Sequence, residues 1–135
     1  MLSLFPELFN YSFLAIGVLR ISVGIIFLWF AYIKTFKERA DYLIFFEKLK
    51  MRPAKLFLNI AIVVELLIGA AFTAGYYTQI AALSAGVLMT LASLIKWHRP
   101  SMLHQNSVSF YFLTAVVSLA LAFIGPGAFA FDLPL

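Results

Sequence analysis

The feature that most constrains this chain is its division into apolar runs long enough to cross a lipid bilayer. Residues 11–33 read YSFLAIGVLRISVGIIFLWFAYI, which is 23 positions with one charge. At about 1.5 Å per residue such a helix exceeds a hydrocarbon core of about 30 Å. Further apolar runs cover residues 54–75, 79–95 and 107–124. With 64% hydrophobic and 12% charged residues among 135, the sequence predicts a single transmembrane domain, residues 1–135, folded as an all-α four-helix bundle.

A charged segment, residues 34–53, separates the first two apolar runs and reads KTFKERADYLIFFEKLKMRP. Its apolar residues recur at roughly helical spacing, with Lys, Arg and Asp at other positions: Phe36, Tyr42, Leu43, Phe46 and Leu49. This pattern predicts an amphipathic interfacial helix that lies on the membrane surface between spans 1 and 2. Pro53 suits the start of the helix that follows.

The basic residues are confined almost entirely to two connections. Residues 34–55 contain seven Lys or Arg, and residues 96–106 contain two. The positive-inside rule therefore predicts an inner (cytoplasmic) membrane protein with both connections cytoplasmic and both termini non-cytoplasmic. The same rule accounts for the formal charge of +4, so membrane lipid is an expected partner and nucleic acid is not.

Two opposite charges interrupt the apolar runs. Arg20 lies nine residues from the outer end of its span at Tyr11, and Glu65 lies ten residues from the outer end of its span at Gly75. The sequence therefore places them at nearly equal depths of about 13 and 15 Å. Small residues flank both charges, Gly17 and Gly24 around the first. Because an unpaired charge in lipid is costly, we expect Arg20 and Glu65 to pair inside the bundle. Removal of one partner should cost roughly 3 to 5 kcal/mol.

The last two apolar runs each carry a mildly polar stripe. The first stripe contains Ala82, Gly86, Thr90 and Ser93, and the second contains Tyr111, Thr114 and Ser118. Small and hydroxyl residues are ordinary in the packing of membrane helices. The alternative interpretation is a polar-lined pocket around the ion pair, open to a small amphipathic molecule.

Other kinds of site have little support in the sequence. The chain has no cysteine, which excludes thiolate metal sites and redox pairs. His98 and His104 are six residues apart, unlike the four-residue spacing that places two imidazoles on one helical face. We expect no metal, haem or nucleotide, and no hydrolase motif is present.

Three stretches together resemble the DoxX-like family of small four-helix membrane proteins. They are VLRISVGIIFLWFAYIK at 18–34, VVELLIGAAFTAGYYTQIAAL at 63–83 and LAFIGPGAFAFDLPL at 121–135. Family positions match Arg20, Gly24, Lys34, Glu65, Gly69, Gly75, Gly125, Gly127 and Asp132. The charged insertion after Phe36 departs from the commoner family pattern.

The resemblance implies a relative of the membrane subunits of thiosulfate:quinone oxidoreductase. It implies a quinone as cofactor, bound by Arg20, Glu65 and Tyr111, with Glu65 as the catalytic group for proton transfer. Electrons would come from a partner protein subunit, so catalysis by this chain alone is not expected.

Two other functions stay open at this point. A non-catalytic assembly subunit would use residues 34–53 to dock a partner protein, and the ion pair would only fix the helix register. A small-solute carrier would need a water path and two alternating states, for which four short spans without a repeat are poor support. Further copies of the chain are another kind of partner that the sequence leaves open.

Overall fold

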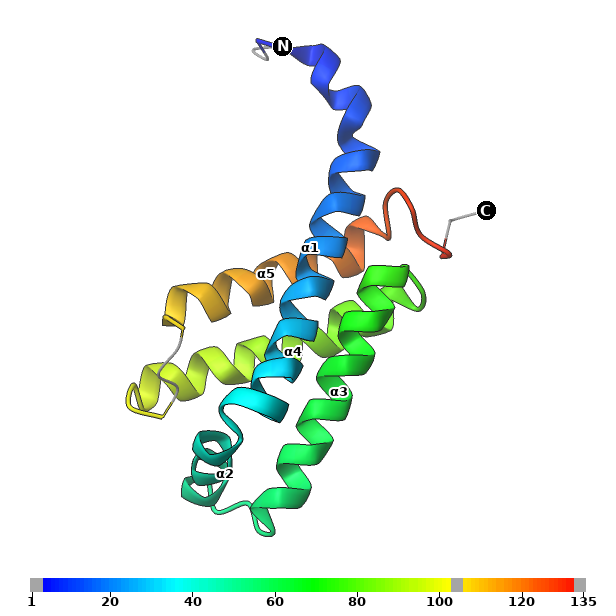
Figure 1. Ribbon diagram of the computed structural model, residues 1–135. Coiled ribbons are helices and arrows are strands. Elements are labelled where there is room, and N and C mark those ends of the chain that lie inside the picture. The colour runs from blue at the N-terminus through cyan, green and yellow to red at the C-terminus, as the bar shows by residue number, and fades with distance from the viewer. Residues whose placement is uncertain (1–3, 103–105, 133–135) are drawn as a thin grey trace.

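The computed structural model describes residues 4–102 and 106–132, and these residues form helices joined by short connections (Figure 1). In chain order the helical elements are η1 (Pro6–Tyr11), α1 (Ser12–Tyr32), η2 (Ile33–Lys37), α2 (Arg39–Lys48), α3 (Ala54–Ala74), α4 (Thr78–His98) and α5 (Val108–Ile124). The predicted all-α membrane bundle, with an additional helix between the first two spans, is confirmed.

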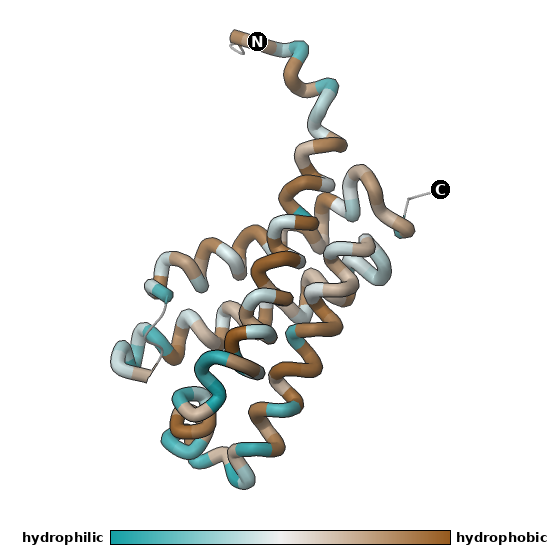
Figure 2. The backbone as a smooth tube through the Cα atoms, in the orientation of Figure 1, coloured by the Kyte–Doolittle hydropathy of each residue, from teal (hydrophilic) through white to brown (hydrophobic). Residues whose placement is uncertain are grey.

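Among the described residues, three stretches of helix are long and apolar enough to cross a membrane: residues 6–37, α3 and α4. Helix α5 has 17 residues, which gives a rise of about 25 Å, at the short end of the range for a membrane span. Hydrophilic positions gather along α2 and the connections beside it, whereas α1 and α3 are largely hydrophobic (Figure 2). The chain is therefore an integral membrane protein, and its orientation stays a prediction.

Helices α1 and α3 pack as an antiparallel pair because glycines let their backbones approach. A Cβ added at Gly24 would lie 3.0 Å from the carbonyl oxygen of Gly69 and 2.9 Å from the backbone nitrogen of Thr73. The expected role of small residues in close helix packing is thus confirmed at Gly24 and Gly69. This contact also sets the register: Gly24 faces the turn between Gly69 and Thr73.

Helices α4 and α5 form a second pair, which crosses the first at a large angle in Figure 1. Gly86 gives room to Leu119, whose Cδ2 atom would lie 2.4 Å from an added Cβ. Small buried residues complete the contact on both helices, namely Ala81, Ala82, Ala85, Ala115 and Ala122. The α4–α5 pair is therefore held mainly by close packing of small side chains.

An aromatic cluster joins the two helix pairs. The ring of Phe27 lies 6.2 Å from that of Phe30 and 6.4 Å from that of Phe72. Phe30 in turn lies 6.0 Å from Phe110 and 6.4 Å from Tyr111, both on α5. Ring pairs at these distances contribute about 0.5 to 1.5 kcal/mol beyond the area they bury.

Helix α2 packs its apolar side chains against the bundle. Tyr42, Leu43 and Phe46 contact a buried cluster formed by Ala31, Leu58 and Ile62 of α1 and α3. In the chain this helix follows the first span and precedes the second, as predicted. Part of its apolar face, however, packs against α1 and α3. Ile44, on another side of α2, is exposed.

Residues 125–132, here called the C-terminal segment, cross the end of the bundle opposite α2 (Figure 1). The backbone N–H of Ala128 donates to the Phe13 carbonyl at 3.0 Å, and that of Asp132 donates to the Gly75 carbonyl at 2.8 Å. The segment thereby ties the end of α5 to both helices of the first pair.

Candidate functional site

The charged contact at the centre of the bundle is between Lys34 and Glu65. Lys34 Nζ donates a hydrogen bond to Glu65 Oε1, and the two side chains are 13% and 7% exposed. By the register of α1 and α3, Glu65 faces Phe30, so Lys34 begins one helical turn, about 6 Å, nearer to α2. Helical side chains lean toward the N-terminus of their own helix. In an antiparallel pair the two side chains therefore lean toward each other.

Lys34 lies on η2, a π-helical turn that connects α1 to α2. The backbone N–H of Glu38 closes this turn by donating to the Ile33 carbonyl at 2.9 Å. The turn directs the chain into α2 so that Lys34 Nζ lies 4.9 Å from the ring centroid of Tyr42. The ammonium group thus contacts a carboxylate and an aromatic face, two favourable environments for a cation. Single π-helical turns of this kind are frequent at functional sites.

A cavity of about 260 Å³, here called the Glu65 cavity, opens beside this contact. Its polar lining consists of Lys34, Tyr42, Glu65 and Tyr111. The walls are mostly apolar and include Phe30, Phe45, Phe46, Leu88, Met89 and Ile95. Glu65 Oε2 is buried and has no hydrogen-bond partner in the described part of the chain. The cavity therefore combines apolar walls with an unused acceptor.

Comparison with models of known protein families gives a match to DoxX over residues 15–98. This chain belongs to the DoxX family. The matched range holds Arg20, Lys34, Tyr42 and Glu65, whereas Tyr111 lies beyond it. Neither the curated proteins nor the solved structures give a significant match.

In this DoxX-family chain the predicted ion pair between Arg20 and Glu65 is wrong. Arg20 Nη2 instead donates to the carbonyl oxygens of Ala128, at 2.9 Å, and Phe129, at 3.0 Å. The register explains the error, because Arg20 faces Gly75 and its backbone is therefore about 15 Å from that of Glu65 along the helices. Each side chain also leans toward its own helix N-terminus, and hence away from the other.

The predicted depth of Arg20 was wrong because of the position of the first helix. The prediction took Tyr11 and Gly75 as level ends of two spans. Instead, η1 and the first turns of α1 extend past the rest of the bundle (Figure 1), and residues 4–15 are exposed. Arg20, which is fully buried, consequently belongs to the end of the bundle where the C-terminal segment crosses.

Of the predicted cofactor-binding residues, the structure places Glu65 and Tyr111 on the Glu65 cavity, and Arg20 does not line it. The polar stripes serve mainly their own helices. Thr114 donates to the Phe110 carbonyl at 2.8 Å. Thr90, although part of the predicted inward stripe, is exposed and donates to the Gly86 carbonyl at 2.7 Å.

Sequence reasoning missed Lys34 and Tyr42 as site residues. Lys34 was assigned to a basic connection, yet it follows the buried Phe27 by seven positions and Phe30 by four, which places it on the same helical face. Burial raises the pKa of Tyr42 far above its ordinary value, and negative charge on nearby groups, including Glu65, adds to the effect. Its phenol consequently stays protonated at neutral pH and can donate a hydrogen bond.

His98 does not line this site. His98 is exposed at the end of α4, and His104 lies outside the described residues. Across residues 4–102 and 106–132, no group of three His, Asp or Glu side chains is arranged to hold a metal ion.

Proposed function

We propose that this DoxX-family chain is the membrane subunit of a redox system and binds the headgroup of a quinone, or a similar amphipathic ring, in the Glu65 cavity. The observation that carries the proposal is the lining of that cavity, in which an ion pair and two phenols meet mostly apolar walls. Sites for small molecules typically combine apolar walls with a few convergent polar groups. A volume of about 260 Å³ suits one substituted ring whose tail stays in the lipid.

The polar groups fit both redox forms of such a ring. Lys34 Nζ and the phenols of Tyr42 and Tyr111 are donors for the carbonyl oxygens of a quinone. Glu65 Oε2, which has no partner among the described residues, is an acceptor for the hydroxyl of a quinol. In this proposal Lys34 takes the donor role that the sequence assigned to Arg20.

A bound quinone would supply a two-electron acceptor whose reduction takes up two protons. Glu65 is the residue we assign to proton transfer, with Oε2 as the atom that holds the proton while Oε1 stays hydrogen-bonded to Lys34. Because the chain has no cysteine, no thiol can carry electrons, and we place the electron donor in a partner protein.

Binding of decylubiquinone, a short-tailed quinone, to the purified chain in lipid nanodiscs tests this proposal. Glu65→Gln replaces the charged acceptor that we assign to the quinol with a neutral amide, and Tyr42→Phe removes one donor. Their matched controls are Glu47→Gln, an exposed carboxylate of α2, and Tyr32→Phe, an exposed tyrosine at the end of α1.

We expect Tyr42→Phe to weaken quinone binding about twofold to twelvefold, as for the loss of one hydrogen bond of about 0.5 to 1.5 kcal/mol. Glu65→Gln should weaken binding of the reduced form by at least about tenfold, because a hydrogen bond to a charged group is stronger. The two control variants should bind as the wild type does. Undetectable binding to the wild type, or equal binding by the Glu65→Gln variant, would refute the proposal.

A further inference from the structure

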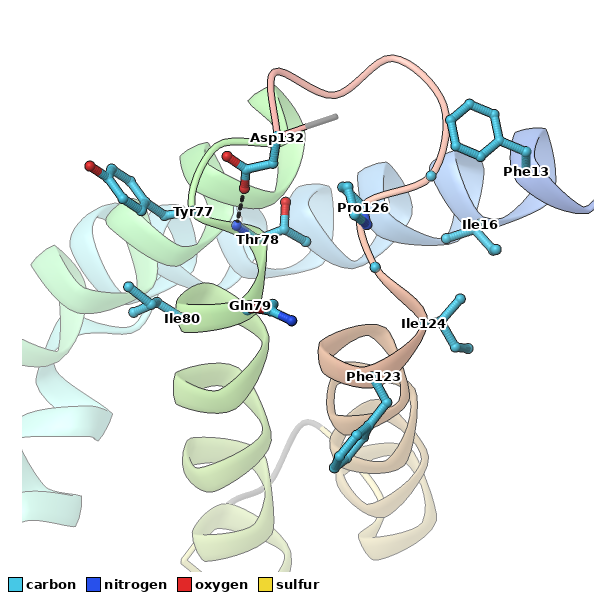
Figure 3. A pocket seen from close by; sticks show the side chains of 12 residues that line it. Phe13, Ile16, Tyr77, Thr78, Gln79, Ile80, Phe123, Ile124, Pro126 and Asp132 are labelled. Carbon is cyan, nitrogen blue, oxygen red and sulfur yellow. Dashed lines mark hydrogen bonds between the residues drawn. The ribbon is translucent and has the colours of Figure 1, made fainter. Parts of the chain in front are cut away.

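A second and larger cavity lies at the opposite end of the bundle from α2. It has a volume of about 680 Å³, and we call it the Asp132 cavity. Figure 3 shows it between the start of α4, the end of α5, the C-terminal segment and the exposed part of α1. None of the four polar residues of the Glu65 cavity lines it, so it is a separate site.

One pole of this cavity is a carboxylate held at the start of α4. Asp132 Oδ2 accepts a hydrogen bond from the backbone N–H of Thr78 at 2.5 Å, drawn as a dashed line in Figure 3. This hydrogen bond is the main reason why the pKa of Asp132 lies below its ordinary value. Asp132 is therefore ionised at neutral pH.

No Lys or Arg among the described residues lines the cavity to neutralise that carboxylate. Arg20 is the cation whose charge acts on Asp132, but it is fully buried and donates to the Ala128 and Phe129 carbonyls. A molecule entering the cavity consequently meets a negative group.

Two further groups at this pole suit a cation that carries N–H donors. Tyr77 presents an aromatic ring at the edge of the cavity, and aromatic faces attract ammonium groups. Thr78 is 1% exposed; its hydroxyl helps to lower the pKa of Asp132, and its Oγ1 accepts no hydrogen bond from the described residues. A hydroxyl oxygen in that state can accept from an ammonium N–H.

Apart from Gln79, whose Nε2 donates to the Ala122 carbonyl at 3.3 Å, the remainder of the cavity is apolar and opens toward the outside of the bundle. Its walls are formed by Phe13, Ile16, Ile80, Phe123 and Ile124. Phe123, at the edge of the cavity, is 87% exposed, which places it in contact with the surrounding lipid if α5 spans the membrane. Apolar walls of this kind favour a hydrocarbon chain over a freely soluble amine.

From these contacts we infer that the Asp132 cavity binds a lipid with a primary ammonium headgroup. The ammonium group pairs with Asp132 and contacts the Tyr77 ring and Thr78 Oγ1. The lipid chain lies along the apolar walls. An anionic headgroup is disfavoured because it would meet the carboxylate, and a quaternary ammonium has no N–H to donate.

Native mass spectrometry of the full chain, released from nanodiscs with equal parts of phosphatidylethanolamine, phosphatidylcholine and phosphatidylglycerol, tests this inference. We expect phosphatidylethanolamine to be retained at least about fivefold over each of the others, equivalent to about 1 kcal/mol. Asp132→Asn should abolish the preference, and Glu7→Gln, which changes an exposed carboxylate of η1 outside the cavity, should keep it.

A second variant separates headgroup binding from the tie that Asp132 makes to α4. Gln79→Trp fills the space between α4 and α5, into which Figure 3 shows the Gln79 side chain pointing, and it leaves Asp132 intact. Ile60→Trp adds the same ring system at an exposed site on α3 outside the cavity. The inference requires that Gln79→Trp lose the preference and Ile60→Trp keep it. Equal retention of the three lipids by the wild type would overturn it, as would an unchanged preference in Asp132→Asn or in Gln79→Trp.

A final arm distinguishes a lipid from a free amine. Ethylammonium has the headgroup charge without the chain, so at concentrations matching the lipid it should not displace phosphatidylethanolamine. Displacement by ethylammonium would overturn the assignment to a lipid.

Discussion

Because Lys34 and Glu65 occupy different depths, the loss of each partner should have a different cost. Glu65 lies eleven residues from Ala54, about 17 Å into α3, and its short side chain cannot reach water if Lys34 is removed. Lys34→Met should therefore cost about 3 to 5 kcal/mol of unfolding free energy, as for other buried pairs that lose one partner. Lys34 begins one turn nearer to α2 and is the more exposed partner, so in Glu65→Gln its long side chain can turn toward water.

The cost of Glu65→Gln should consequently be only about 1.5 kcal/mol, the low end for a hydrogen bond to a charged group. In the double variant neither position holds a buried charge, and the total cost should fall below that of Lys34→Met alone. The coupling energy then has the sign expected for a direct interaction.

Reversible unfolding in mixed micelles, followed by far-ultraviolet circular dichroism, measures these free energies. The decisive comparison is between the loss of unfolding free energy in the double variant and the sum of the losses in the two single variants. Additive losses would show that Lys34 and Glu65 do not interact. A larger loss in Glu65→Gln than in Lys34→Met would refute the argument from depth.

Three further predictions concern the C-terminal segment and the orientation of the chain. Gly75 has a φ of +71° and an added Cβ would lie 1.9 Å from Arg20 Nη1, whereas at Gly125, with a φ of +101°, an added Cβ meets nothing within 4 Å. Gly75→Ala should therefore lower the unfolding free energy by about 3 to 5 kcal/mol and Gly125→Ala by about 1 to 3; the reverse order in the same micelle assay would contradict this. Because the pKa of Asp132 is lowered by folding, its contribution to stability is complete above its unfolded value of about 3.9 and is lost as the pH falls through its folded value. Between about pH 5 and pH 3, the thermal unfolding temperature should accordingly change less in Asp132→Asn than in the wild type. The same pH dependence in both proteins would contradict this prediction. A reporter fused to the carboxyl end should be active outside the cytoplasm, and cytoplasmic activity would reverse the predicted orientation.

The helices were predictable from sequence because length and hydropathy alone determine where a membrane span can lie. The site depended on a different quantity, the register between α1 and α3. The contact between Gly24 and Gly69 determines that register, and it places Arg20 beside Gly75 and Lys34 near Glu65. The depths counted from the sequence assumed instead that the two helices end at the same level. That assumption is wrong because α1 extends past the rest of the bundle.

Tyr42 was harder to predict than Lys34. Its place on the Glu65 cavity depends on the π-helical turn of η2 and on the packing of α2 against α1 and α3. Neither leaves a periodic signal in the sequence. Glu65, by contrast, was identifiable because a carboxylate within an apolar span requires a partner.

The C-terminal segment also determines where the bundle can deform. Through hydrogen bonds to Phe13, Arg20 and Gly75 it fastens the end of α5 to the first helix pair. The opposite ends of the two pairs are joined by side-chain packing around α2 and have no comparable backbone tie in the described residues. If one pair swings relative to the other, the fastened end acts as the pivot. The displacement then grows with distance from that pivot, so it is larger around the Glu65 cavity than around the Asp132 cavity.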